Sequence, residues 1–153
     1  MSLTLSQIYA INPAASLLPT DLIYLDRSLT DYGIQASDLA TSIFPTVVVI
    51  TASAQMNTNT RYIANRASLV SLSLPLTSSV GDTITIAGMG IGGWSIIQAA
   101  GQQIFISPDV STLGVAGSVS SAAQYDSLVL QCLVSNMKWT ALGGPQSSGL
   151  III

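Results

Sequence analysis

The sequence predicts an all-β fold, a small antiparallel β-sandwich or barrel-like module, from two observations, its choice of surface residues and its alternating segments. Hydrophobic residues also make up 49% of the 153 residues and charged residues only 7%, whereas an average soluble domain carries roughly 25% charged residues, so part of the surface is expected to be buried against copies of the same chain. Glutamate is absent and lysine occurs once, although both normally fill exposed helix faces. Short alternating segments rich in Ser, Thr, Val and Ile lie between turn signals, as is typical of strands.

Residues 1–44 differ from the rest and are predicted to form an attachment segment. Residues 22–25 form a candidate strand, 26–31 a turn and 32–34 a returning strand. Ser37 is a suitable N-cap for a short helix over 38–43. A hairpin and one short helix are too small for a stable domain. The apolar and aromatic side chains expected to hold this segment to a partner are Leu22, Tyr24, Tyr32, Ile34 and Leu39.

A succession of short strands is predicted after Pro45. Residues 45–60 are expected to be a connecting strand or linker, and 61–153 a β-rich module with an apolar C-terminal tail. Residues 111–123, which are mostly small, are predicted to be a loop, and 135–137 a tight hairpin turn. The predicted strands cover residues 47–54, 68–74, 83–86, 94–98, 103–106, 127–134 and 138–142.

The predicted strand 127–134 is apolar on both faces. Leu128, Leu130, Cys132 and Val134 alternate on one face, and Val129 and Leu133 lie on the other. A strand of this kind is typically covered on both sides. In so small a module the second cover is expected to come from an identical subunit. These six residues, with Trp94 and Trp139, are therefore the candidate core and oligomer interface.

Composition also bears on compartment and partners. The longest apolar runs are far shorter than the roughly 18 residues of a membrane-spanning helix, and the N-terminus lacks the basic start and apolar stretch of a signal peptide. We therefore expect neither a transmembrane segment nor a signal peptide. The net charge of −3, with four basic residues, argues against nucleic-acid binding, which normally needs a basic surface.

The sequence offers little catalytic chemistry. It has no histidine, so a Ser-His-Asp triad, a Cys-His dyad and imidazole metal ligands are excluded. Cys132 is expected to be a buried core thiol. Asp82, Asp109 and Asp126 are the candidates for a glycosidase pair, but aspartate in turns commonly caps the backbone. We therefore expect no enzyme, no metal and no cofactor.

Two further features admit a functional and a structural interpretation. The glycine-rich segment 88–93 lacks the context of a nucleotide-binding loop, because no Lys follows it and the next segment is a predicted strand. Close backbone packing, near an oligomer axis, is the preferred interpretation. Trp94, Trp139 and Tyr125 could stack on sugars, whereas burial of both tryptophans in the core or interface is the favoured alternative.

The order of several short motifs resembles a module of bacteriophage tail fibres and appendages, over about residues 61–142. A Y-I-A-N sequence at 62–65 precedes L-V-S-L-S-L-P at 69–75 and V-G-D at 80–82. Further similar segments are 86–98, 101–104, 125–128 and Trp139. Residues 20–43 separately resemble the N-terminal attachment segments of phage structural proteins.

This resemblance implies a homotrimeric β module fixed to a virion by its N-terminal segment. The expected partners are other copies of the chain and other virion proteins of the capsid, baseplate or tail, with a host surface glycan as a further possibility. Since the chain ends soon after one module, a short spike, connector or capsid decoration is favoured over a long receptor-binding fibre. The alternatives are a carbohydrate-binding module at a fibre tip and, third, a polysaccharide-degrading spike.

Overall fold

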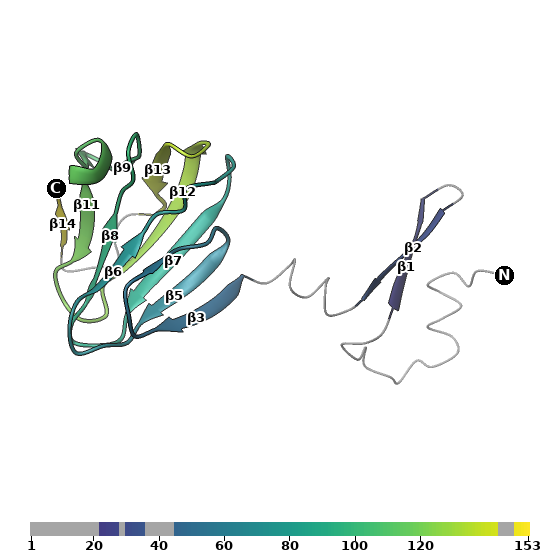
Figure 1. Ribbon diagram of the computed structural model, residues 1–153, viewed down its shortest axis with the longest axis horizontal. Coiled ribbons are helices and arrows are strands. Elements are labelled where there is room, and N and C mark those ends of the chain that lie inside the picture. The colour runs from purple at the N-terminus through teal and green to yellow at the C-terminus, as the bar shows by residue number, and fades with distance from the viewer. Residues whose placement is uncertain (1–21, 28–29, 36–44, 144–148) are drawn as a thin grey trace. The chain divides into compact units, whose positions relative to one another are not determined.

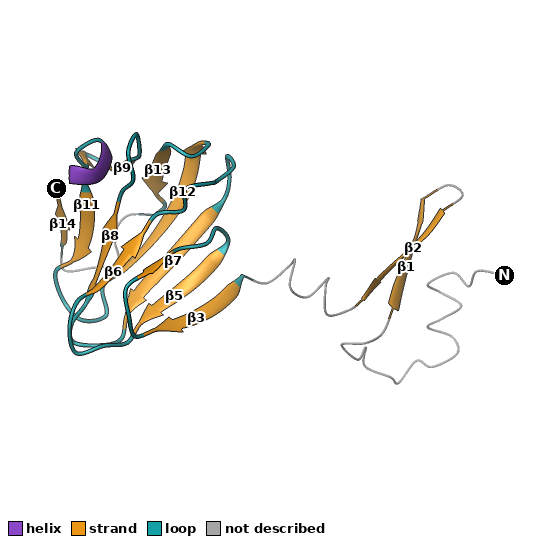
Figure 2. Ribbon diagram, viewed as in Figure 1, coloured by secondary structure: helices purple, strands orange, loops and turns teal. Residues whose placement is uncertain are grey.

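A computed structural model describes residues 22–27, 30–35, 45–143 and 149–153. The described residues are mostly strands, joined by loops and a single turn of 3-10 helix (Figure 2). The predicted all-β class is therefore confirmed. The chain divides into two compact units, Met1–Pro45 and Thr46–Ile153, and each is described by itself.

The first unit contains the predicted hairpin. Strand β1 (Leu22–Arg27) pairs antiparallel with β2 (Thr30–Gln35), with Leu22 opposite Gln35 and Leu25 opposite Tyr32. Four of the five candidate attachment residues lie in this hairpin: Leu22, Tyr24, Tyr32 and Ile34. Leu39 and the predicted helix over 38–43 lie outside the described residues.

The second unit is a sandwich of two sheets, of seven and five strands, that enclose one hydrophobic core (Figure 1). The seven-stranded sheet has the order β10 (Asp109–Val110), β9 (Gln103–Ile106), β13 (Lys138–Ala141), β12 (Ser127–Val134), β7 (Thr83–Gly88), β5 (Thr60–Ala64) and β3 (Thr46–Ile50). The five-stranded sheet has the order β14 (Leu150–Ile152), β11 (Ser118–Ser121), β8 (Trp94–Ile97), β6 (Val70–Ser73) and β4 (Ala54–Gln55). The 3-10 helix η1 (Gly114–Ala116) precedes β11.

Both sheets are mixed, so the predicted purely antiparallel arrangement is wrong. From β3 to β8, successive strands alternate between the two sheets, and each returns to its own sheet in the same direction. The pairs β3·β5, β5·β7, β4·β6 and β6·β8 are consequently parallel. The physical reason is that a connection that crosses the sandwich, unlike a hairpin, preserves strand direction on return. The later strands pair differently: β12 is antiparallel to β7 and β13, β11 is antiparallel to β8 and β14, and β13 is parallel to β9.

Period-two alternation places the core. In β7, Ile84 and Ile86 are buried, whereas the intervening threonines are partly exposed. In β12, Leu128, Leu130 and Cys132 are buried by the same alternation. A strand directs successive side chains to opposite faces of its sheet, so one apolar residue in two suffices to fill the space between the sheets.

Three boundaries differ from those predicted. Residues 45–60, expected to be a connecting strand or linker, supply β3 and β4, one edge strand of each sheet. The C-terminal tail forms β14, which pairs with β11, and β11 and η1 lie in the segment 111–123 that was predicted to be a loop. Such short or serine-rich segments have only weak strand propensity of their own, but hydrogen bonds to a neighbouring strand can hold them in the strand conformation.

Candidate interaction surface

The outer face of the seven-stranded sheet is the largest continuous set of outward strand positions. Register aligns Val47 with Arg61, Val49 with Ile63, and Thr140 with Phe105 across neighbouring strands. Val47 and Val49 are each 58% exposed, and the charged residues at outward positions of these seven strands are Arg61 and Lys138. We call this surface the outer apolar face after its apolar members, Val47, Val49, Ile63, Ala87, Phe105, Val110, Val129 and Leu142. They share it with uncharged polar residues at other outward positions, Thr83, Thr85, Gln103, Ser127, Gln131 and Thr140.

The outer face of the five-stranded sheet is chemically different. Ser71, Ser95 and Ser120 are aligned across β6, β8 and β11, and the Ser120 hydroxyl donates a hydrogen bond to the Ser95 hydroxyl at 2.7 Å. Further serines, Ser73 and Ser118, lie at neighbouring outward positions. The outer face of the five-stranded sheet is therefore rich in serine, with Ile97 and Ile151 as its exposed apolar residues, whereas the outer face of the seven-stranded sheet combines apolar residues with threonine and glutamine.

Strand β12 contributes to both the core and the outer apolar face. Leu128, Leu130 and Cys132 point into the core, and Val129 is half-buried on the outer face. Val134, expected beside Cys132, is instead 42% exposed, as is Leu133 at 48%. The pairing of β12 with β13 shifts register between Cys132 and Val134, and such a bulge ends the alternation that would have turned Val134 inward.

Trp94 and Trp139 are both completely buried in the core, so neither offers an exposed ring for sugar stacking. The Trp94 indole Nε1–H donates to the backbone oxygen of Asp126 at 2.9 Å. The buried Nε1–H of Trp139 has no hydrogen-bond partner among the described residues. Of the three aromatic residues considered for sugar stacking, Tyr125 alone reaches solvent, at 71% exposure and with a φ of 69°.

This difference between the two indoles predicts unequal effects of the same substitution. We expect Trp94→Phe to lower the free energy of unfolding by about 1–3 kcal/mol more than Trp139→Phe, because only the first removes a formed hydrogen bond and the second removes an unsatisfied donor. Urea unfolding followed by far-UV circular dichroism, at equal protein concentrations, measures both. Equal losses would contradict the assigned hydrogen bonds.

The aspartates of the sandwich serve the backbone. Asp126 is buried, and its Oδ2 accepts hydrogen bonds from the amides of Ala122 and Ala123 at 2.7 and 2.8 Å. The Asp82 carboxylate accepts from the Asn59 side-chain amide at 2.9 Å and from the Ser79 amide at 2.8 Å. Each therefore fixes a turn, as expected for aspartate in such positions.

These two aspartates also lie too far apart to act as a glycosidase pair. Asp126 immediately precedes β12, whereas the Asp82 carbonyl accepts a hydrogen bond from Cys132 near the other end of that strand. Six residues of strand span about 20 Å, whereas glycosidase carboxylates are about 5–9.5 Å apart. Asp109 is exposed on the edge strand β10. Within the described part of the chain, no three metal-ligating side chains cluster.

The glycine-rich segment 88–93 packs against another loop of the same chain. Gly92 donates its amide to the Arg66 carbonyl, and Met89 and Gly90 donate theirs to Ala64. A Cβ atom on Gly90 would overlap the backbone of Arg66, and one on Gly92 would overlap the backbone of Ser68. Close backbone packing thus explains these glycines within one subunit.

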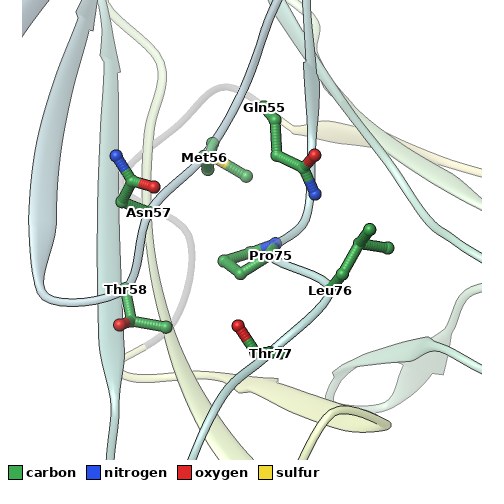
Figure 3. Close-up of a pocket in the computed structure, with 7 residues that line it drawn as sticks. All are labelled: Gln55, Met56, Asn57, Thr58, Pro75, Leu76 and Thr77. Carbon is green, nitrogen blue, oxygen red and sulfur yellow. The ribbon is translucent and has the colours of Figure 1, made fainter.

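A shallow pocket of about 220 Å³ lies beside β4 and is shown in Figure 3. It is smaller than the roughly 300–1,000 Å³ of typical ligand pockets. Its lining residues are Gln55, Met56, Asn57, Thr58, Pro75, Leu76 and Thr77, none of them an acid or a base. These residues offer amide, hydroxyl and apolar contacts but no group for proton transfer.

Two buried glutamines are the polar residues that sequence reasoning missed. The Gln98 side-chain amide donates to the carbonyls of Gln102, Thr112 and Gly114, and its oxygen accepts from the Ser111 hydroxyl. The Gln102 side-chain amide donates to the Pro75 carbonyl at 2.7 Å. The available signal was a pair of glutamines around a glycine turn, between apolar strands. Their contacts are satisfied within the chain, so they organise the loop over 107–117.

No family model matches the chain, and no curated protein matches its sequence. Among the described residues, no helix has the length and apolar character required to cross a membrane. The candidate surface therefore has to be interpreted from its own chemistry.

Proposed function

We propose that this chain is a non-enzymatic structural subunit of a virion, a short fibre, spike or capsid decoration that functions as a homotrimer. The observation that carries the proposal is the outer apolar face, a broad sheet surface with few charges in a chain of only 7% charged residues. Large exposed apolar patches on soluble proteins commonly mark interaction sites. The order of motifs that resembles phage appendage modules supports the virion and the threefold assembly.

The mechanism of this function is assembly. Burial of the outer apolar face contributes about 25 cal/mol per Å² of apolar surface, and a stable interface removes about 800 Å² from each partner. Val47, Val49 and Val129 bring no charge to be desolvated. β-branched side chains on strands also lose little rotamer freedom when they become buried. Contact between such faces therefore favours an ordered oligomer.

The N-terminal unit is proposed to attach the oligomer to a capsid, baseplate or tail protein. It contains the β1–β2 hairpin, and an isolated two-stranded hairpin is at best marginally stable in water. A larger partner surface would supply the contacts that such a hairpin lacks. Attachment through this unit leaves the sandwich available for contacts between copies.

Light scattering on the full chain tests the proposal. We expect a mass that contains three copies or a multiple of three, and a stable monomer would contradict it. Val129→Lys, at the centre of the outer apolar face, is expected to dissociate the threefold contact, because a buried lysine charge would have to be desolvated. Ser73→Lys, at an outward position of the serine-rich outer face of the five-stranded sheet, is the matched control and should leave the mass unchanged.

A further inference from the structure

Among the described residues of the sandwich, no strand pairs with the outer side of the edge strand β3. It is the last strand of the seven-stranded sheet, and its neighbour on the other side is β5. The Ile50 carbonyl accepts a hydrogen bond from Asn65, the residue that follows β5. The amide and carbonyl of one residue point to the same side of a strand, and this side alternates along the chain. Thr46, Val48 and Ile50 therefore bond toward β5, and Val47 and Val49 direct their backbone groups to the open edge.

The sequence of β3 itself lacks three of the usual protections against pairing. Natural edge strands are commonly blocked by charged side chains, an internal proline or a bulge. The strand β3 has the sequence TVVVI and pairs with β5 in unbroken register. No charged residue occurs in the sequence between Asp38 and Arg61, so no like charges would oppose the approach of a second strand.

We propose that β3 pairs antiparallel with β3 of a second copy of this chain, about a twofold axis at Val48. In this register Val47 lies opposite the partner's Val49, and Val48 lies opposite the partner's Val48. Each copy offers two amides and two carbonyls, from Val47 and Val49, and the pairing satisfies all of them. The two seven-stranded sheets then become one continuous sheet across the seam.

The side chains suit this register as well. On the outer face, the valines of the seam would form two β-branched cross-strand pairs, a favourable combination in sheets. Arg61 is aligned with Val47, and Val49 with Ile63. Since Val47 lies opposite the partner's Val49, Arg61 is aligned across the seam with the partner's Ile63 and not with the partner's Arg61. No pair of like charges is therefore brought together.

A second copy of this chain is the favoured occupant of the open edge. The β3 strand of a second copy offers the same two amides and two carbonyls, so a twofold pairing satisfies the open edges of both chains at once. With no charged residue between Asp38 and Arg61, that copy also brings no charge against this edge.

The inference rests on the self-association in the proposed function and adds a specific contact to it.

Cysteine scanning tests the register. Val48→Cys is expected to form an intermolecular disulfide, because residues in a non-hydrogen-bonded antiparallel pair have Cα atoms about 4.5 Å apart, within the range for a disulfide. Thr46→Cys is the matched control, since equivalent residues would be about 13 Å apart along the strand, and it should stay reduced. The unsubstituted chain controls for Cys132, which is buried.

Val49→Pro tests the hydrogen bonds. Proline lacks only the amide that points to the open edge, and prolines are tolerated there. A homotrimer whose chains also pair through β3 is a hexamer of two trimers, so we expect this variant to keep its circular dichroism spectrum and to fall from six copies to three by light scattering. Val115→Lys, at an exposed position of η1, should keep the native mass.

The outcomes separate the two proposals. A native mass of three copies, unchanged in Val49→Pro and without a Val48→Cys disulfide, would overturn the edge contact and leave the trimer. A dimer that cross-links through Val48→Cys would support the edge contact and overturn the trimer. A native monomer would overturn both. A disulfide that forms equally in Thr46→Cys would overturn the proposed register.

Discussion

Replacement of Gly92 by alanine is expected to lower the free energy of unfolding by about 3 kcal/mol, the upper part of the range for forced overpacking. The added Cβ would overlap the backbone of Ser68, which cannot move aside as a flexible side chain would. Gly92 also donates its amide to the Arg66 carbonyl at 3.0 Å, so separation of the two loops would break that bond as well. Urea unfolding at fixed protein concentration measures the loss.

Gly101→Ala is the control for this substitution, because it isolates backbone strain from steric overlap. Gly101 has a φ of 79°, and a Cβ there would meet no atom within 4 Å. An alanine in this left-handed conformation costs about 1 kcal/mol. If Gly92→Ala were no more destabilising than Gly101→Ala, the close packing of segment 88–93 against residues 66–68 would be wrong.

Gln98→Leu is expected to destabilise the sandwich by about 3 kcal/mol. The leucine fills a similar volume, but it withdraws the amide that lies 2.8–3.1 Å from the carbonyls of Gln102, Thr112 and Gly114. It also removes the acceptor of the Ser111 hydroxyl. Buried polar groups left without partners cost about 1–3 kcal/mol each. The Gln102 and Gly114 carbonyls keep backbone hydrogen bonds after the substitution. The total loss of stability therefore stays well below the sum for four unpaired groups, the three carbonyls and the Ser111 hydroxyl.

The effect of Gln98→Leu should also be local. Amide hydrogen exchange is expected to accelerate first at Gly114, whose amide donates to the Gln102 carbonyl at 2.8 Å within the same network. Gln124→Leu is the control, since its side chain bonds the Met89 carbonyl at an exposed site and surface changes are usually within about 0.5 kcal/mol. Exchange that accelerates uniformly across the sandwich would argue against a local role for Gln98.

The sequence predicted the faces of strand 127–134 well but did not predict the buried glutamine network. Alternation in 127–134 correctly placed Leu128, Leu130 and Cys132 on one buried face and Val129 on the other, and the apolar character of Val129 pointed to an outer contact. Val134 could not be placed in this way, because a bulge depends on the partner strand β13. The glutamine network was missed because Gln98 and Gln102 meet their acceptors only after residues 111–114 fold back on them.

By itself, the sequence determined the strand content, most strand positions, the β12–β13 hairpin and the absence of imidazole chemistry. Each of these follows from local composition or from the period of two, which states which face a side chain occupies. Only the tertiary structure decided that the strands from β3 to β8 alternate between sheets, that β3 and β4 each form one edge of a sheet, and that serine-rich β11 is a strand at all. The physical reason is that alternation identifies a face but not a neighbour, because the backbone groups that choose the neighbour are the same in every residue except proline.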